Sequence, residues 1–512
     1  MSRFCLGILL GHALLIASFG SARADEKPLL FNPRAFGAVG DSKTVDTAAF
    51  NKAIEAAHAA GGGTVFVSAG TYVCGSIHLQ SNIAIHVDQG ATIVASADPA
   101  DYDQPEPNKW DKFQDFGHSH WHNSFFWGED IENVTIDGSG LLYGKGLSKM
   151  QGSVQPHLVG NKTISLKNCH NITLRDISIL HGGHFAILVT GVDNLTIDNL
   201  KIDTNRDGMD IDCCRNVRVS NCSVNSPWDD AICPKSSFGL GVLRPTENVS
   251  ITNCYVSGGW QEGTLLDGTF KPFEAQQRIP RTGRIKFGTE SNGGFKNMAI
   301  SNCIFENCGG LAIESVDGAI IEDVSITNIT MRGIVNSPIF IRLGNRARGP
   351  DNPPPGVIRR VNISNVVCSN AASRLGSIIS GIPGHPIEDL RISNVQIVQQ
   401  GGGTAANAEI KPPERENTYP EPGMFGTMPS YGFYIRHVKN LEMHHIDVSY
   451  DKPDMRPVMA LNDVAGVEMD HIKAKRTPSV PFFVLHDVTD FSVQNATGIA
   501  DTKRENASDE SF

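Results

Sequence analysis

Short stretches in which apolar and polar residues alternate recur along most of the chain. The first copies are Asn133-Val-Thr-Ile, Asn171-Ile-Thr-Leu, Asn194-Leu-Thr-Ile, Asn216-Val-Arg-Val and Asn248-Val-Ser-Ile, and similar copies continue to Gly466-Val-Glu-Met. Alternation with a period of two is typical of a β-strand with one buried face. The copies return about every 22 to 50 residues, which is the length of one solenoid coil plus a variable loop. The pattern therefore predicts an all-β, single-stranded parallel β-helix, because one such strand cannot bury its face alone.

Asparagine begins many of these copies and predicts bends between the strands. Its side chain bonds to nearby backbone and tolerates left-handed geometry, and a stack of such side chains can bond from coil to coil. A β-propeller and a leucine-rich horseshoe are poorer interpretations, because the signature residues of both repeats are missing.

A helix is predicted before the first copy, where it would cap the open end of the solenoid. It runs from Thr47 to about Ala60, with Asp46 as N-cap, one apolar face that includes Phe50 and Ile54, and the glycines at 61–63 after its end. We expect the first strand to begin at Thr64.

The N-terminal residues Met1–Ala24 read as a secretory signal peptide, with Arg3, an apolar run and an Ala-Arg-Ala end. We expect residues 25–500 to form one β-helix domain and residues 501–512 a polar C-terminal tail. No later stretch is comparably apolar, so the sequence favours a secreted or periplasmic protein without membrane insertion; a retained N-terminal anchor is the alternative.

The net charge of −11 argues against nucleic-acid partners, which require a basic surface. An acidic polysaccharide is still allowed, because only the local field of a cleft has to be positive. We expect a monomer. Of the eleven cysteines, Cys222, Cys254 and Cys303 each follow an Asn in the repeat, which suggests buried thiols stacked at one coil position, although disulfides remain possible in an exported protein.

Aspartates are densest between Lys201 and Ser236, in Asp207-Gly-Met-Asp210-Ile-Asp212 and in Asp229-Asp230. Asp207 and Asp230 are about one coil apart, so we expect them on neighbouring rungs roughly 4.8 Å apart. Adjacent strand residues point to opposite faces, so Asp229 and Asp230 reach one cleft only if the chain kinks there, and we predict that kink. Like charges held together raise at least one pKa, as a general acid requires. Solvated turn aspartates and a calcium site are the alternatives.

The segments Asn205-Arg-Asp207-Gly-Met-Asp210 and Asp229-Asp230-Ala-Ile-Cys resemble glycoside hydrolase family 28, the polygalacturonase family, whose pattern is Asn-Thr-Asp-Gly followed by Asp-Asp. The resemblance extends from Phe31-Asn-Pro-Arg to the late repeats. It implies a right-handed parallel β-helix and an inverting mechanism that needs no metal or other cofactor. Asp229 would donate the proton, and Asp207 and Asp230 would together activate water, with carboxyl groups about 6.5–9.5 Å apart.

Two family motifs are altered. Thr282 stands where the His of a Gly-His-Gly is expected, and Ala312-Ile-Glu314 aligns with the Arg-Ile-Lys that grips a galacturonate carboxylate. An Arg-Ile-Lys does occur earlier, at Arg284-Ile-Lys286, and strand alternation places both charges on one face. We interpret it as a relocated carboxylate grip; solvated surface cations are the alternative.

Further candidate substrate-binding residues are Asp210 and Lys235 within the acidic segment and His184, which precedes Asp207 by about one coil. A structural role for His184 is equally possible, as it is for the histidines at 118, 120 and 122. Arg342, Arg346 and Arg348 form a second basic cluster that could flank the same cleft. The insertion Gly401–Ser430 is either a wall at one end of the groove or a flexible surface loop.

The function that we expect is an exported glycosidase that cleaves pectic, galacturonate-containing polysaccharide of the plant cell wall. The altered motifs suggest a substrate other than plain unbranched homogalacturonan. A calcium-dependent polysaccharide lyase and a non-catalytic glycan-binding β-helix are the alternatives.

Overall fold

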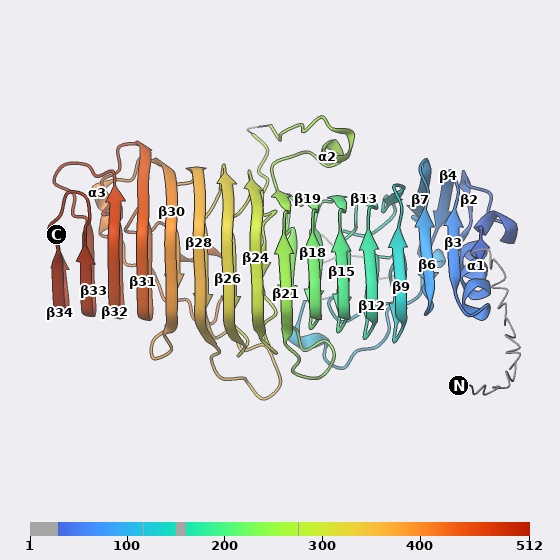
Figure 1. The fold of residues 1–512 in the computed structure, drawn as a ribbon, viewed down its shortest axis with the longest axis horizontal. Coiled ribbons are helices and arrows are strands. Elements are labelled where there is room, and N and C mark those ends of the chain that lie inside the picture. The colour runs from blue at the N-terminus through green and yellow to red at the C-terminus, as the bar shows by residue number, and fades with distance from the viewer. Residues whose placement is uncertain (1–28, 116, 150–159, 275) are drawn as a thin grey trace, which may run out of the picture.

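The computed structural model describes residues 29–115, 117–149, 160–274 and 276–512 as one elongated stack of coils (Figure 1). The predicted signal peptide, Met1–Ala24, lies outside these residues. The strands form a 28-stranded and a 6-stranded sheet in which almost all pairs are parallel. This is the predicted right-handed parallel β-helix. Among the described residues, no helix has the length and apolarity that a membrane crossing requires.

Three sheet faces run along the stack, one strand per face in each coil. One face carries the site described below, and its strands are β5 (Ile77–His78), β8 (Phe126–Glu129), β11 (Lys162–Lys167), β14 (Phe185–Thr190), β17 (Asp207–Asp212), β20 (Ile232–Lys235), β23 (Lys286–Phe287), β25 (Leu311–Ser315), β27 (Ile339–Leu343) and β29 (Ser377–Ser380). We call it the site face. It continues into the first residues of β31 (Phe433–Lys452), β32 (Met459–Ala474) and β33 (Phe483–Gln494).

The other two faces are separate strands in the early coils and fuse into long bent strands later. The second face comprises β1 (Leu30–Phe31), β3 (Gly63–Val67), β6 (Ile83–Val87), β9 (Glu132–Asp137), β12 (His170–Arg175), β15 (Asp193–Asp198), β18 (Arg215–Ser220) and β21 (Thr246–Thr252). The third comprises β2 (Asp41–Val45), β4 (Gly70–Cys74), β7 (Ala91–Ala95), β10 (Leu141–Tyr143), β13 (Ser178–Leu180), β16 (Lys201–Asp203), β19 (Ser223–Asn225) and β22 (Tyr255–Ser257). The fused strands are β24 (Phe295–Glu306), β26 (Ile320–Arg332), β28 (Val357–Ala371) and β30 (Ile387–Gly401).

Asparagines make the bends, as the repeat predicts. Asn194 and Asn216 have φ angles of 55° and 57°, in the left-handed region that Asn tolerates. The Asn216 amide donates to Asn194 Oδ1 at 3.2 Å, and Asn194 donates in turn to Asn171 at 3.1 Å. The ladder therefore turns the chain and ties successive coils together.

The alternating apolar residues form a continuous core inside the coils. Leu195 and Ile197 of β15 lie in register with Val217 and Val219 of β18, and all four are buried. The described cysteines are buried free thiols, in agreement with the predicted stack; Cys254 is placed between the coils of Cys222 and Cys303.

Helix α1 (Thr47–Ala59) covers the N-terminal end of the stack, at the end predicted for it (Figure 1). Asp46 does not cap it through its side chain, because the carboxylate instead accepts the backbone N–H groups of Val39 and Gly40. The strand at Thr64 is also not the first, since β1 and β2 precede α1.

The C-terminal segment is a strand rather than the expected polar tail. β34 (Thr502–Ser511) pairs antiparallel with β33. Only Ala507 of β34 is buried. The prediction of a tail was wrong because a strand at the end of the stack needs little apolar surface to pair through its backbone.

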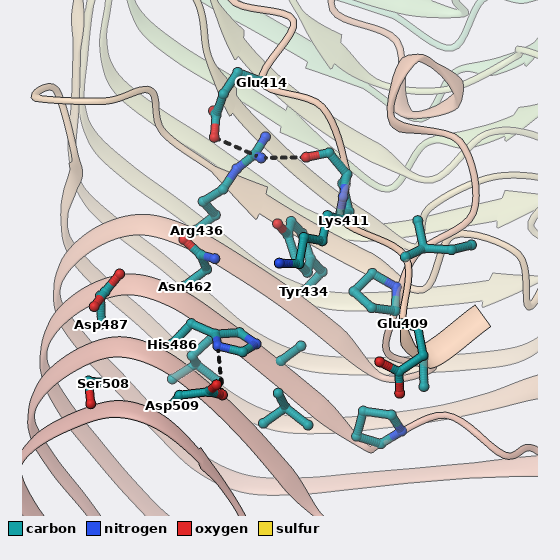
Figure 2. A pocket seen from close by; sticks show the side chains of 18 residues that line it. Glu409, Lys411, Glu414, Tyr434, Arg436, Asn462, His486, Asp487, Ser508 and Asp509 are labelled. Carbon is teal, nitrogen blue, oxygen red and sulfur yellow. Dashed lines mark hydrogen bonds and ion pairs between the residues drawn. The ribbon is translucent and has the colours of Figure 1, made fainter. Parts of the chain in front are cut away.

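The insertion Gly401–Ser430 is folded onto the site face, which supports the wall rather than the flexible loop. It contains α3 (Ala405–Ala408) and the 3-10 turn Pro422–Phe425, and it buries Phe425 and Met428 against Phe340 and Tyr434. A hollow lies beside its first half, over the last coils (Figure 2). A short helix, α2 (Thr264–Asp267), lies in another loop that projects from the middle of the stack (Figure 1).

Candidate active site

The central aspartates lie on neighbouring coils of the site face, as predicted. Asp207 begins β17, and Asp230 lies two residues before β20, the next strand in the sheet. The Gly208 N–H donates to the Asp230 carbonyl at 3.0 Å. A Cβ on Gly208 would lie 2.3 Å from the Ala231 carbonyl oxygen, so only glycine allows the two coils to approach here.

Asp229 and Asp230 lie in a turn, which confirms the predicted kink. β19 ends at Asn225 and β20 begins at Ile232, so the two aspartates are not successive strand residues. Both line one cavity of about 260 Å³. The turn is fixed from the next coil, because the Gly283 N–H donates to the Asp229 carbonyl at 2.8 Å.

Six of the eight predicted site residues line this cavity: Asp207, Asp229, Asp230, His184, Lys235 and Lys286. Asp210 and Arg284 are fully buried behind it. The remaining lining residues are Asp115, His118, Arg206, Thr289, Glu290 and Tyr419.

Asp230 is held between two cations. Arg284 Nε lies 2.8 Å from Asp230 Oδ1, and Lys286 Nζ lies 3.0 Å from Oδ2. Burial alone would raise the pKa of Asp230, but Lys286 and Arg284 outweigh it and lower the pKa to about 2. The relocated Arg-Ile-Lys thus grips a carboxylate, and in this structure the carboxylate belongs to the protein.

The pKa values of Asp229 and Asp207 are raised, in contrast to that of Asp230. Burial and the charge of Asp230 raise the pKa of Asp229, although Arg206 Nη2 lies 2.6 Å from its Oδ2. Burial and the charges of Asp229 and Asp210 raise the pKa of Asp207 well above its ordinary value. The Asp207–Asp229 pair therefore retains a proton at a pH at which an isolated aspartate is ionised, while Asp230 beside it is ionised.

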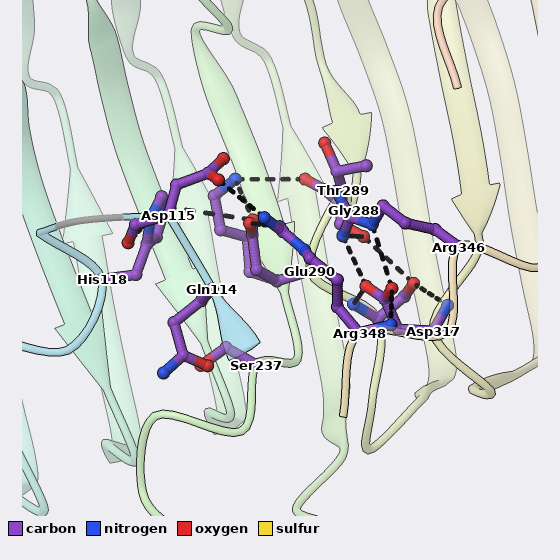
Figure 3. A network of polar contacts seen from close by, with 12 residues as sticks. Gln114, Asp115, His118, Ser237, Gly288, Thr289, Glu290, Asp317, Arg346 and Arg348 are labelled. Atoms are coloured by element: carbon purple, nitrogen blue, oxygen red, sulfur yellow. Dashed lines mark hydrogen bonds and ion pairs between the residues drawn. The ribbon is translucent and has the colours of Figure 1, made fainter. Parts of the chain in front are cut away.

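A polar network on one side of the cavity connects the coils to the loop at residues 103–122. His118 Nε2 lies 2.9 Å from Asp210 Oδ2. It also lies 4.0 Å from Glu290 (Figure 3). Lys235 Nζ lies 3.1 Å from Glu290 and 3.7 Å from Asp210. Burial lowers the pKa of His118, but Glu290 and Asp210 outweigh it and raise the pKa, which favours the protonated imidazole at the point where the loop contacts the site face.

The three arginines of the second basic cluster, Arg342, Arg346 and Arg348, do not lie in one place. Arg348 bridges Asp115 and Glu290, each at 2.7 Å, and so joins segments 233 residues apart (Figure 3). Arg346 is held by Asp317. Arg342 lies elsewhere, buried, with Glu414 and Gly381 carbonyls as acceptors. Two of the three arginines therefore flank the cavity, as suggested.

His184 lies one coil before the acidic group, because its neighbour Phe185 is in register with Asp207. Burial and the charge of Arg206 lower the pKa of His184 well below its ordinary value, so this ring is neutral. Its Nδ1 is buried and has no hydrogen-bond partner among the described residues. His122 lies outside the cavity and contacts Glu129 at 2.8 Å.

Glu314 occupies the position of the lysine in the aligned family motif. It lies one coil after Lys286, 3.9 Å from Nζ, and neither of its buried carboxyl oxygens has a hydrogen-bond partner among the described residues. Burial outweighs the attraction of Lys286 and Arg284 and raises its pKa to about 8. A neutral carboxyl therefore replaces the family cation.

Sequence reasoning singled out His118 without committing to it and missed Glu290, Arg206 and Tyr419 as site residues. Glu290 and Arg206 had an available signal, because each lies in a segment adjacent to a predicted site residue. Tyr419 comes from the insertion and gave no periodic signal; its hydroxyl accepts from Thr289 at 2.8 Å and from Lys286 at 3.2 Å. No three described His, Cys, Asp or Glu residues are grouped as a metal site.

The stacked coils and the cavity lined by carboxyl groups can now be compared with known proteins. Residues 30–264 match the family model described as rhamnogalacturonase A/epimerase, pectate lyase-like. A probable polygalacturonase from Vitis vinifera is 24% identical over 392 residues, covering 71% of this chain and 73% of the relative. An Arabidopsis thaliana exopolygalacturonase is 23% identical, covering 69% and 74%. The chain is therefore similar to polygalacturonases over most of its length, in agreement with the resemblance noted in its motifs.

Solved structures share the fold at low sequence identity. The exopolygalacturonase of Thermotoga maritima superposes with a TM-score of 0.57 at 18% identity, covering 95% of this chain and 96% of that one. The polygalacturonase of Erwinia carotovora gives 0.51 at 17% identity, covering 73% and 94%.

Proposed function

We propose that this chain is a glycosidase that cleaves glycosidic bonds of pectic, galacturonate-containing polysaccharide by an inverting acid/base mechanism. The observation that carries the proposal is one cavity in which a carboxyl with a raised pKa, Asp229, adjoins a carboxylate with a pKa of about 2, Asp230. Such a division between acid and base is what glycoside hydrolysis requires. The similarity to polygalacturonases supports the class of substrate.

Asp229 donates its proton to the leaving glycosidic oxygen, and a carboxylate on the other side activates the attacking water. Asp230 is the ionised member of the group and Asp207 shares the work of positioning the water. Arg206 faces Asp229 and balances the negative charge that remains after proton transfer. The separation of the carboxyl groups, about 6.5–9.5 Å for inversion, remains a prediction.

Lys235, Lys286 and His184 are the substrate-binding residues of the proposal, because they line the cavity. Asp210 and Arg284 act through neighbours: Asp210 faces Lys235 and His118, and Arg284 orients Asp230. The substrate is an acidic plant cell-wall polysaccharide other than plain homogalacturonan, since Thr282 and Glu314 replace two family side chains. We further propose an exported, monomeric protein with no nucleic-acid partner.

A calcium-dependent lyase is less well supported by the cavity. Calcium sites gather oxygen ligands that are free to face the ion. Here Asp230, Asp229 and Glu290 are each paired with a protein cation at 3.1 Å or less. These residues do not fit a calcium ion, and no step of the proposal uses one.

The test is digestion of defined pectic oligosaccharides by the wild type and Asp229→Asn, with product anomers followed by NMR. We expect inversion, and a loss of rate of about 10³-fold or more in the variant. Asp203→Asn is the matched control: Asp203 is a buried aspartate outside the cavity with a pKa raised to about 6, so it should retain activity.

Four outcomes contradict the proposal. Retention of configuration removes the inverting mechanism, and undiminished activity of Asp229→Asn removes the assigned acid. An unsaturated product that absorbs ultraviolet light identifies a lyase, and binding without any cleavage identifies a glycan-binding protein.

A further inference from the structure

A second hollow of about 640 Å³ lies on the site face, over the last three coils. Its floor is the beginning of β31, β32 and β33, and its wall is the segment 408–414 of the insertion (Figure 2). Tyr434 in this floor belongs to the same row of the sheet as Lys286 in the catalytic cavity, with three coils between them. The insertion thus divides one sheet face into two separate hollows.

Two parallel rows of side chains form the floor. Tyr434, Ala460 and Val484 make an apolar row, and Arg436, Asn462 and His486 make a polar row two residues further along each strand. Coils are roughly 4.8 Å apart, so the same pair of surfaces is presented three times in succession. Apolar patches beside regularly placed hydrogen-bonding groups suit sugars, which have apolar ring faces and equatorial hydroxyl groups.

Arg436 is a built feature of this hollow rather than a solvated cation. It is 2% exposed, lies against the Tyr434 ring at 5.6 Å, and donates to the Pro412 and Pro413 carbonyls at 2.9 and 3.1 Å. Its Nε is buried and has no hydrogen-bond partner among the described residues. A buried donor without a partner is costly, and a ligand hydroxyl would satisfy it.

The charges of the lining disfavour a polyuronate. Glu414 lies 2.9 Å from Arg436 and neutralises it. The other charged side chains are one lysine, Lys411, and three carboxylates, Glu409, Asp487 and Asp509, of which Asp509 lies 3.2 Å from His486 Nδ1. The excess negative charge repels a chain of uronates, whereas an uncharged ligand pays no such penalty.

We propose that this hollow binds a neutral oligosaccharide segment, separately from the catalytic cavity. The apolar row supports the sugar faces, and Arg436, Asn462 and His486 bond to the hydroxyl groups. The proposal does not depend on the catalytic one, because it concerns binding at a different place.

The test is calorimetric titration of the full chain with neutral galacto- and arabino-oligosaccharides and with oligogalacturonate. The protein carries Asp229→Asn throughout, so that no ligand is consumed. We expect Asn462→Ala and His486→Ala each to weaken binding of a neutral oligosaccharide about tenfold, as the loss of one or two hydrogen bonds would. His444→Ala is the matched control, because His444 is a partly exposed histidine of β31 outside the hollow.

Binding of a neutral oligosaccharide that depends on Asn462 and His486 but not on His444 supports the proposal. It is overturned if no neutral oligosaccharide binds, if both floor variants bind as the parent does, or if oligogalacturonate competes for the same residues. Thermal melting of each variant checks the fold, and melting unchanged together with binding lost separates recognition from stability.

Discussion

Lys286 Nζ lies 3.0 Å from Asp230 Oδ2, so the cation that the sequence suggested for a substrate carboxylate is paired with a carboxylate of the protein. The pair is fully buried, and Arg284 completes it from the same strand segment. The consequence is an ionised Asp230 next to Asp229, whose pKa is raised.

Removing the charge of Lys286 should move the acid limb of the pH–rate profile upward. Lys286 is the largest influence that lowers the pKa of Asp230, so in Lys286→Met this pKa rises and less Asp230 is ionised at acid pH. We expect kcat/KM to fall about tenfold more at pH 4 than at pH 6, since one pKa unit is a factor of ten.

Lys286→Arg should restore most of the acid limb because it keeps the charge. Lys296→Met removes an exposed lysine paired with Glu322 outside the cavity, and its profile should match the wild type. If kcat/KM of Lys286→Met fell by the same factor at all pH values, Lys286 would contribute to substrate binding and not to the ionisation of Asp230.

Tyr419 should restrict where along a polymer cleavage occurs. Its side chain lines the catalytic cavity from the insertion and bonds to Thr289 and Lys286. Tyr419→Ala opens this wall, so we expect internal cleavage to rise, seen as a several-fold larger viscosity drop per reducing end released. Tyr419→Phe keeps the ring and should behave as the wild type; an unchanged ratio in Tyr419→Ala would show that the wall lies elsewhere.

Glu314 should make the protein less stable as pH rises. Its pKa is raised from an ordinary 4.5 to about 8 in the folded state, so the folded protein keeps a proton that the unfolded chain releases above pH 4.5. The cost therefore grows between about pH 4.5 and 8 and then stays constant, at roughly 3 to 5 kcal/mol.

Glu314→Gln mimics the protonated form and should abolish this loss. We expect equal melting temperatures of variant and wild type at pH 4 and a higher one for the variant at pH 9. A variant that is less stable at pH 9 would show that the ionised form of Glu314 is the one stabilised.

Asn216 separates two contributions of the asparagine ladder. Its φ is 57°, and its side-chain Nδ2 donates to Asn194 while its side-chain Oδ1 accepts from Asn248. Alanine loses these bonds and adds left-handed strain of about 1–2 kcal/mol, whereas glycine loses only the bonds. In denaturant unfolding we expect Asn216→Ala to be less stable than Asn216→Gly, and both to be less stable than the wild type. Equal stabilities of the two variants would show that the hydrogen bonds, and not the left-handed backbone, account for the contribution of Asn216 to stability.

The fold was predictable because most coils carry the same alternating sequence pattern. The alternation that begins at Asn194 and Asn216 fixes strand, buried face and bend together. The same regularity placed Asp207 and Asp230 on neighbouring coils, and strand alternation required the kink at Asp229. These predictions succeeded because each concerned residues no more than one coil apart in the sequence.

The rest of the cavity could not be predicted, because it depends on loops that follow no period. Asp115 meets Arg348 across 233 residues, and Tyr419 reaches Thr289 across 130. The partner of Arg284 and Lys286 was also hidden, since alternation places two charges on one face but does not say what lies opposite. For β34, a strand with one buried residue carries no hydrophobic signal.

The reversed direction of β34 gives the stack a terminus that differs from all its interior levels. Its exposed residues include Lys503, Glu505 and Asp509, so a second molecule that approached this end would meet charged side chains instead of an apolar surface. Trimming the chain before Thr502 would uncover β33 as an unpaired edge with Phe483 and Phe491 beside it. Truncated molecules could then pair end to end through this edge, and the length of the resulting assembly would depend on protein concentration.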